Sequence, residues 1–316
     1  MKKMGWCPTA IRPMRSGDGL LVRLRLSCGI VSPGLARLIA DWAESFGNGL
    51  IDLTSRANLQ LRGVTDETLQ KLQERLAEHD LLDPPGMRSV LCSPLAGIDP
   101  KALLDVRPVV HEIENALRGE HRLPEKFCFL VDDGGSLRLD PRSADVAFVA
   151  QSATHFRIGG PAIAPARPLG RHDNAFGLGV PFGRLDAAKL RLLADSAQEL
   201  RLTPWRAILL VGGGPVEGFL HDNDDPLRGA AACPGAPSCH QGTVSTREIA
   251  VALAPVTPLH VSGCSKGCAH PGPSPVTLVG REGLYDIVFD GKAGDSPAFR
   301  GLTQDQAIQI LREKVI

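Results

Sequence analysis

The chain has 316 residues, and its 35 lysines and arginines balance its 35 aspartates and glutamates, so the formal net charge is zero. A chain of this size has room for two or three domains, and without a basic excess we expect neither general nucleic-acid binding nor binding to anionic membranes. No apolar run reaches the roughly 18 residues of a membrane span, and the first residues lack the apolar core of a signal peptide, so we expect a cytoplasmic protein.

The first quarter of the chain reads as alternating strands and helices. Apolar residues alternate with arginines in the first strand, and the first helix has Pro33 at its first helical position. The predicted elements are a strand over 20–26, a helix from Ser32–Pro33 to Gly47, strands over 50–53 and near 59–61, and a helix that Thr65 caps and that runs to about His79.

The same order recurs in the second half. Residues 38–43 (LIADWA) match residues 192–197 (LLADSA), and the arginine after Leu53–Thr54 matches Arg206 after Leu202–Thr203. This diverged repeat predicts a pseudo-two-fold protein. The predicted elements are strands over 177–180 and 207–211, a helix over 185–200, a helix from a Ser245–Glu248 capping box to about Ala254, strands near 259–261, 276–279 and 284–289, and a last helix over 304–313 that Thr303 caps with Gln306.

The eight cysteines are distributed unevenly. Cys7, Cys28, Cys92 and Cys128 are scattered, and for the first three we expect small buried side chains. The other four form two pairs, Cys233-x5-Cys239 and Cys264-x3-Cys268, in loops rich in Gly and Pro. Four thiolates suit an iron–sulfur cluster or structural zinc, and unrelated buried thiols are the third alternative. The five-residue gap favours the cluster, because zinc knuckles usually have shorter gaps.

These pairs resemble the 4Fe–4S signature of the siroheme-dependent nitrite and sulfite reductase superfamily. Further segments resemble motifs of that superfamily in the same chain order: residues 53–63 (LTSRANLQLRG), 88–94 (RSVLCSP), 123–128 (LPEKFC) and 263–268 (GCSKGC). The resemblance implies an α+β fold with two ferredoxin-like halves in a pseudo-two-fold repeat plus two αβ segments, and a tetrapyrrole pocket between them. The implied domains are 1–66 and 159–212 for the halves, 67–158 for the first αβ segment and 213–316 for the cluster-binding segment.

Within the superfamily, residues 12–23, 232–239 and the tail from 278 to 302 most resemble the precorrin-3B synthase family of cobalamin biosynthesis. Two departures from the reductases favour this branch. Ala57 follows Arg56 where the reductases have Gln, and Cys128 takes the place of a lysine, which removes a charge that would hold a small oxyanion.

The resemblance implies a monooxygenase that uses molecular oxygen to convert precorrin-3A to precorrin-3B by hydroxylation and γ-lactone formation. The implied cofactors are one 4Fe–4S cluster on the four paired cysteines and a mononuclear non-heme iron, for which the sequence assigns no ligands. His240 and His270 adjoin the cysteine loops, but isolated loop histidines are usually exposed. The side chains expected to bind the carboxylates of the tetrapyrrole are Arg56, Arg88, Lys126, Arg15, Arg23 and Arg25.

Two alternatives stay open at this point: a siroheme-dependent sulfite or nitrite reductase, and a non-catalytic iron–sulfur electron-transfer or zinc-binding protein. The glycines at 212–214 follow a predicted strand, but they lack the GxGxxG pattern and are followed by Pro215. We therefore expect no bound nicotinamide or flavin, and a separate ferredoxin or reductase as electron donor.

Overall fold

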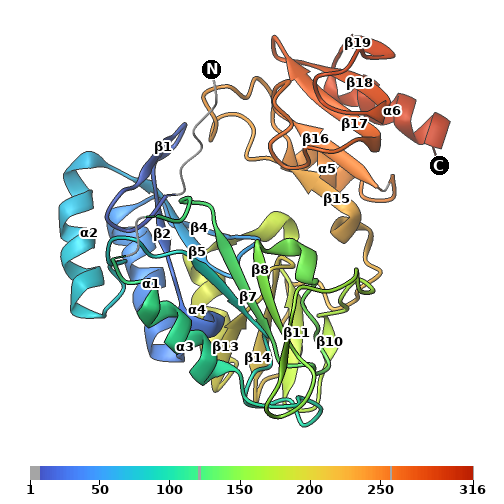
Figure 1. The fold of residues 1–316 in the computed structure, drawn as a ribbon. Coiled ribbons are helices and arrows are strands. Elements are labelled where there is room, and N and C mark those ends of the chain that lie inside the picture. Colours follow the sequence, from blue (N-terminus) through green and yellow to red (C-terminus); the bar gives the residue numbers. More distant parts are fainter. Residues whose placement is uncertain (1–7, 120–121, 257, 316) are drawn as a thin grey trace. The chain divides into compact units, whose positions relative to one another are not determined.

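The computed structural model describes residues 8–119, 122–256 and 258–315, so Cys7 lies outside the described residues. The chain forms two compact units (Figure 1). Unit 1 contains the residues up to Met14 and Leu20–His221, and unit 2 contains Arg15–Gly19 and Asp222–Ile316. Within the described residues, no helix is long and apolar enough to cross a membrane. The division into four domains that the resemblance implies stays a prediction.

Unit 1 holds two sheets whose strands follow the same plan. The first contains β2, β5, β4 and β12 in that order, and the second contains β10, β11, β14, β13 and β3. The bounds in the first half are β1 Met14–Ser16, β2 Gly19–Leu24, β3 Ile30–Val31, α1 Pro33–Phe46, β4 Leu50–Leu53, β5 Leu59–Val64 and α2 Asp66–Glu78. Those in the second half are β10 Gly170–Arg171, β11 Ala175–Gly179, β12 Arg184–Asp186, α4 Ala187–Asp195, β13 Glu199–Leu202 and β14 Ala207–Val211.

The two halves exchange a strand. β3 comes from the first half but pairs with β13 of the second, whereas β12 comes from the second half and pairs with β4 of the first. A short 3-10 turn precedes each exchanged strand, and in each turn two consecutive residues have a left-handed backbone, Cys28–Gly29 at φ 54° and 68° and Phe182–Gly183 at φ 54° and 69°. These matching turns and pairings confirm the predicted pseudo-two-fold repeat.

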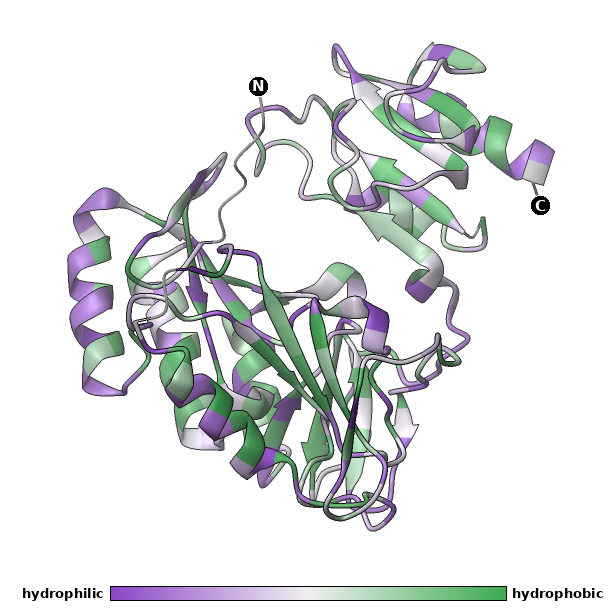
Figure 2. Ribbon diagram, viewed as in Figure 1, coloured by the Kyte–Doolittle hydropathy of each residue, from purple (hydrophilic) through white to green (hydrophobic). Residues whose placement is uncertain are grey.

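The repeat also appears in side-chain contacts between α1 and α4. Arg37 of α1 binds Asp195 of α4 at 2.7 Å, and Arg191 of α4 binds Asp41 of α1 at 2.6 Å. Each helix buries one face, and Figure 2 shows hydrophobic and hydrophilic residues interleaved along the helices.

Three details of the predicted elements are wrong. Residues 185–200 form β12, α4 and the start of β13 rather than one helix, because Asp186 caps a new helix by accepting from the Lys189 amide. The second-half partner of Ala57 is Arg206, since both have a left-handed backbone, at φ 52° and φ 54°. Trp205 is thus the partner of Arg56. The Ser245–Glu248 capping box also fails, because no side chain caps α5.

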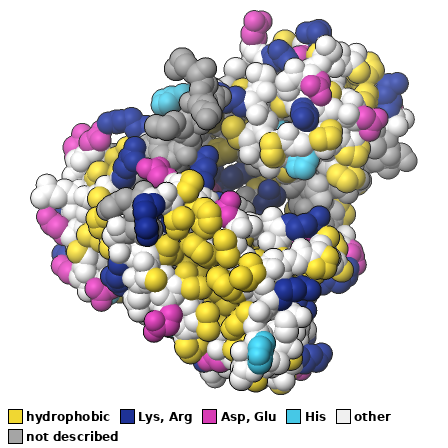
Figure 3. Space-filling model, viewed as in Figure 1, with side chains coloured by type: hydrophobic (Ala, Val, Ile, Leu, Met, Phe, Trp, Pro, Cys, Tyr) yellow, Lys and Arg dark blue, Asp and Glu magenta, His cyan; other side chains and the backbone are white. Residues whose placement is uncertain are grey.

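A third sheet completes unit 1. Its strands are β6 Ser89–Cys92, β7 Cys128–Asp132, β8 Val146–Ala150 and β9 Phe156–Ile158, in that order, with helix α3 over Arg107–Ala116. Figure 3 shows a broad hydrophobic area on the face of unit 1 in view. The outer strand β9 leaves Ile158 74% exposed.

Unit 2 is built on one mixed sheet. The order is β15-β16-β17-β18-β19, in which the first two pairings are parallel and the others antiparallel. The bounds are β15 Ala230–Ala232, α5 Arg247–Ala252, β16 Leu259–Ser262, β17 Ser274–Arg281, β18 Leu284–Gly291, β19 Phe299–Leu302 and α6 Gln304–Val315. Thr303 and Gln306 cap α6 reciprocally, as predicted. Helices combined with parallel and antiparallel sheets confirm the α+β class.

Candidate functional site

The sheet of unit 2 brings the two cysteine pairs to one edge. β15 ends directly before Cys233, and β16 ends directly before Gly263 and Cys264. The two strands are parallel neighbours, with Ala232 opposite Val261. Because parallel neighbours end at the same edge of a sheet, both cysteine loops leave the sheet side by side.

Glycines allow these loops to approach closely. The Gly263 amide donates to Cys233 Sγ at 3.2 Å. A Cβ at Gly263 would lie 3.1 Å from the Cα atoms of both Gly235 and Gly242, and one at Gly280 would lie 2.6 Å from the Gly263 carbonyl oxygen. Larger residues at these positions would separate the loops, so the small residues noted in the sequence serve close backbone contact.

The four thiols share one electrostatic environment. Partial desolvation of the sulfur, and after it charge on Cys264, Cys233 and Cys239, raises the pKa of the Cys268 thiol, although the residue as a whole is exposed. Cys233 is buried, Cys239 and Cys264 are half-buried, and Cys268 is exposed. The structure therefore places the two cysteine loops next to each other, and that these four cysteines bind one group stays a prediction.

This donor set fits an iron–sulfur cluster. Such a cluster takes one thiolate at each iron and accepts amide N–H groups at its sulfurs, and the Gly263 amide already donates to a cysteine sulfur. Within the described part of the chain, no three His, Cys, Asp or Glu side chains converge tightly enough to hold one metal ion. The same residues offer no ligand set for the mononuclear iron.

A histidine that the sequence did not single out lies under the second cysteine loop. His260 of β16 is 1% exposed, and neither of its ring nitrogens has a hydrogen-bond partner among the described residues. Burial and the neighbouring His270 lower the pKa of His260 to about 4, so the ring is neutral at physiological pH. The exposed His240 and His270 are the histidines that the sequence did notice.

The segment Arg15–Gly19 packs on the first cysteine loop. A Cβ at Gly17 would lie 2.5 Å from the backbone nitrogen of His240 and 2.7 Å from Cys239 Cα. Arg15, one of the predicted substrate-binding residues, is exposed on this segment. It therefore belongs to the surroundings of the cysteines in unit 2.

In unit 1, Ser89 joins two of the predicted arginines. The hydroxyl oxygen of Ser89 accepts from Arg25 Nη1 and from Arg56 Nη1, both at 3.4 Å. Arg56 Nη2 also donates to the backbone carbonyl of Lys126 at 2.7 Å, and the Lys126 side chain is exposed. Asp83 lies 3.0 Å from Arg25. Burial raises the pKa of Asp83 against the opposing effect of Arg25.

A polar row crosses the first sheet next to this group. Arg23, Gln60, Asp52 and Arg184 are opposite one another on β2, β5, β4 and β12. Arg23 donates to Gln60 at 2.6 Å, and Arg184 and Arg62 bind Asp52 at 2.7 and 2.9 Å. The row together with Arg25 and Arg56 makes this sheet face net positive, which suits a ligand with several carboxylates.

Arg88 has a different environment from the other predicted arginines. It is 7% exposed, and its guanidinium donates to the carbonyls of Pro124 at 2.7 Å, Gly86 at 2.7 Å, Met87 at 3.2 Å, and Leu123. All three of its nitrogens are used. Arg88 therefore fastens the loop before β6 to the loop before β7.

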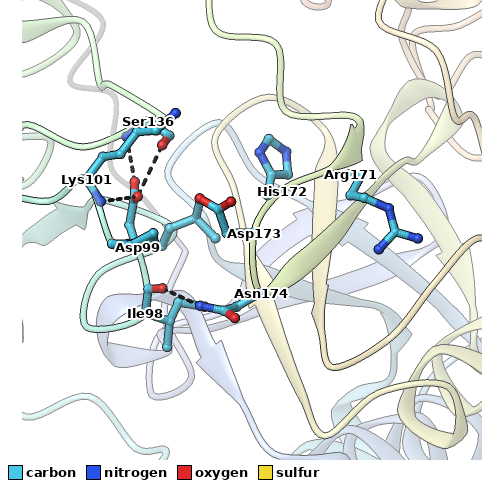
Figure 4. Close-up of a pocket in the computed structure, with 10 residues that line it drawn as sticks. Ile98, Asp99, Lys101, Ser136, Arg171, His172, Asp173 and Asn174 are labelled. Carbon is cyan, nitrogen blue, oxygen red and sulfur yellow. Dashed lines mark hydrogen bonds between the residues drawn. The ribbon is translucent and has the colours of Figure 1, made fainter.

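The described part of unit 1 has several cavities. Two of them, of about 320 and 520 Å³, adjoin Arg25 and Asp83, and the smaller one also adjoins Arg88. Another of about 480 Å³ lies between Asp99 and the Arg171–Asn174 turn (Figure 4). In this last cavity Asp99 already accepts from Ser136 and the Lys101 amide, and the cavity contains none of the predicted site residues.

Sequence reasoning missed several polar residues of the site. They are Asp52, Gln60, Arg62, Asp83, Arg184 and His260. Gln60 and Asp52 occupy polar positions in otherwise apolar strands, which was a readable signal. The partners of Asp83 and Arg184 lie far away in the sequence, so only the fold reveals them.

Comparison with known proteins places these features in context. The model of the nitrite/sulfite reductase ferredoxin-like half domain matches residues 12–79, and that of the nitrite and sulphite reductase 4Fe-4S domain matches residues 84–217. The two matches together span more than half of the chain. Neither includes the four paired cysteines.

Two relatives match over most of this chain and over most of their own length. The chain is 29% identical to a precorrin-3B synthase from a Sinorhizobium species, over 94% of this chain and 85% of that protein. It is 24% identical to a ferredoxin–nitrite reductase from Synechococcus elongatus, over 99% of this chain and 89% of that protein. The structure of the Mycobacterium tuberculosis NirA protein superimposes with a TM-score of 0.66 and 17% identity, covering 94% of this chain and 81% of that one. This last likeness concerns the fold alone.

Proposed function

This chain belongs to the nitrite and sulfite reductase superfamily, and from that premise we propose that it is a precorrin-3B synthase. The observation that carries the proposal is the similarity to a protein of that name over 94% of this chain. The reaction would convert precorrin-3A to precorrin-3B with molecular oxygen, by hydroxylation and γ-lactone formation. Its relatives are oxidoreductases, and the oxygen dependence is part of the proposal.

Two positions in unit 1 favour this reaction over reduction of a small anion. Cys128 stands where the reductases carry a lysine, and its side chain is 1% exposed with its sulfur near the Phe129 carbonyl oxygen. Ala57, where they carry a glutamine, is buried and apolar. Neither side chain carries a positive charge, with which a reductase would stabilise a bound oxyanion.

In this proposal, unit 1 supplies the carboxylate-binding groups. Arg56 and Arg25 can each offer a guanidinium edge to an acetate or propionate of the macrocycle, with Ser89 fixing the orientation of both. Arg23, Lys126 and, in unit 2, Arg15 supply further positive charge. Arg88 contributes indirectly, since it holds the loop that carries Lys126.

In unit 2, Cys233, Cys239, Cys264 and Cys268 would hold the 4Fe–4S cluster, whose chemistry is one-electron transfer. The loop amides, including that of Gly263, would stabilise charge on its sulfurs. We further propose that electrons come from a separate ferredoxin-type donor or reductase. Because the described residues offer no ligands for a mononuclear iron, we derive no step through it.

The proposal is tested with anaerobically prepared full-length protein. Iron and acid-labile sulfide are measured first, and the protein is then given precorrin-3A, a reduced ferredoxin and oxygen-18. We expect a tetrapyrrole product that contains the heavy isotope. A Cys264→Ser variant should lose both the cluster absorbance and the product. Unlabelled product, or no product from cluster-loaded protein, would contradict the proposed reaction.

The second candidate is a siroheme-dependent nitrite or sulfite reductase, which is favoured by the nearly full-length similarity to a ferredoxin–nitrite reductase. An absorption spectrum separates the two candidates. Siroheme gives sharp visible bands, whereas a 4Fe–4S protein without it gives a broad brown shoulder. Siroheme bands together with nitrite or sulfite turnover would establish this second candidate.

A further inference from the structure

His260 is an unpartnered polar side chain inside unit 2. It is 1% exposed, and both of its ring nitrogens lack a hydrogen-bond partner among the described residues. A buried polar group without a partner lowers the stability of the folded state, so native proteins rarely keep one without a reason. The usual reasons include a bound group that the protein was built to receive.

The ring lies against the second cysteine loop. Side chains alternate along a strand, so His260 shares a face of β16 with Ser262, whose hydroxyl donates to the Cys264 carbonyl oxygen at 2.7 Å. A Cβ at Gly267, the residue before Cys268, would lie 3.5 Å from the ring Cε1 atom. His270, two residues after Cys268, packs edge-on against the ring at 5.8 Å between centroids.

The polar neighbours of His260 are already engaged. Thr277 lies opposite it on β17, and its hydroxyl donates to the Gly291 carbonyl oxygen at 2.9 Å. His270 uses its own Nε2 atom with the Pro273 carbonyl oxygen at 3.1 Å. The loop that the ring packs against carries Cys264 and Cys268, whose sulfurs can accept a hydrogen bond.

We propose that His260 is a positioning residue that donates its ring N–H to a sulfur of the iron–sulfur cluster and thereby raises the reduction potential of that cluster. The donor stabilises the reduced, more negative form, as N–H···S bonds do in such sites. The inference rests on the cluster in the proposed function and is independent of the tetrapyrrole reaction.

The test compares reconstituted full-length variants. His260→Leu removes the donor, His260→Gln retains an N–H, and His240→Leu changes an exposed histidine beside the other cysteine loop. At equal iron and sulfide content, redox titration followed by electron paramagnetic resonance should give a more negative potential for His260→Leu than for the wild type. The potential of His260→Gln should lie closer to the wild-type value, and that of His240→Leu should not change.

A second measurement covers the case in which His260→Leu does not hold the cluster. In wild-type protein with nitrogen-15 histidine, the reduced cluster should show a hyperfine coupling to a histidine nitrogen, and His260→Gln should lose it. Equal potentials in wild type and His260→Leu, or no coupling in the wild type, would overturn the inference alone. Absence of iron and sulfide from the wild type would instead overturn the proposed cluster.

Discussion

The guanidinium groups of Arg88 and Arg56 lie in two different environments. Arg88 is buried against four carbonyl oxygens, whereas Arg56 is half-buried beside Ser89. We expect Arg88→Met to lower the free energy of unfolding of unit 1 by about 3 kcal/mol, because it leaves buried carbonyls without donors. Arg56→Ala should change that free energy by less than about 1 kcal/mol and weaken tetrapyrrole binding about tenfold or more.

Denaturant unfolding and a binding titration on both variants check this contrast. Trp42 and Trp205 lie in unit 1, so tryptophan fluorescence follows its unfolding. Should Arg88→Met bind less tightly at unchanged stability, its guanidinium would be a ligand of the substrate instead of a link between loops.

Asp133 is a buried carboxyl group whose surroundings make the stability of unit 1 depend on pH. It is 1% exposed, and its Oδ2 atom has no hydrogen-bond partner among the described residues. Burial, and after it the charges of Asp132 and Asp99, raise the pKa of Asp133. The native state therefore binds more protons than the unfolded state above the ordinary aspartate pKa of about 4, so this group lowers stability as pH rises through that window.

We expect Asp133→Asn to stabilise unit 1 by about 1 kcal/mol at pH 7, because the amide keeps the bond from the Gly135 amide and carries no charge. The gain should shrink as the pH approaches about 4, where the wild-type carboxyl becomes protonated. Unfolding free energies at several pH values measure the difference. A gain that is independent of pH would rule out the charge as its cause.

At the scale of elements, the exchanged strand β12 joins the two halves of unit 1. Leu185 in β12 is 1% exposed, whereas Leu192 of the neighbouring helix α4 is 45% exposed. We expect Leu185→Ala to cost about 3 kcal/mol and the matched Leu192→Ala less than about 0.5 kcal/mol. Denaturation of both variants, monitored by tryptophan fluorescence, checks this. Equal costs would mean that the exchanged strand adds little to the core.

The elements also show what the sequence could and could not predict. Caps and periodicity located α1, α2 and α6 well, because Ser32, Thr65 and Thr303 cap their helices in the structure. The prediction of a single helix over 185–200 was wrong, because apolar residues of a strand, a helix and a second strand follow one another there without a Gly or Pro. At Ser245–Glu248 the Thr246 hydroxyl instead donates to the Cys233 carbonyl oxygen, a partner that only the fold supplies.

The candidate site was also predictable from the sequence only in part. Cysteine spacing predicted two paired loops, and the structure places both loops directly after the ends of the neighbouring strands β15 and β16. The sequence also singled out Arg56 and Arg25, but not the hydrogen bonds of both to Ser89, and it did not distinguish the buried Arg88 from them. His260 escaped notice because an isolated histidine in an apolar strand carries no signal until its lack of partners is visible.

At the scale of the whole molecule, the glycine run after β14 bears on how electrons reach the protein. The glycines after β14 lead into a turn and a loop up to the 3-10 turn at Pro226–Gly229, and no helix follows the strand to receive a pyrophosphate. We expect the purified protein with NADH and precorrin-3A to turn over at least about tenfold more slowly than with a reduced ferredoxin. Product formation under both conditions measures this. Equal rates would show that NADH donates directly.

The exchange of β3 and β12 has a consequence for how this protein could be cut or recombined. In each of the two repeat sheets of unit 1, one edge strand comes from the other copy of the repeat. If the chain were cut within residues 159–168, each piece would therefore lack one edge strand, and the other piece would contain that strand. The two pieces should therefore associate. A chimera that replaces only one copy of the repeat must keep the exchanged strand of that copy. The sequences of the two copies are thus most constrained at the exchanged strands β3 and β12 and at the 3-10 turns before them.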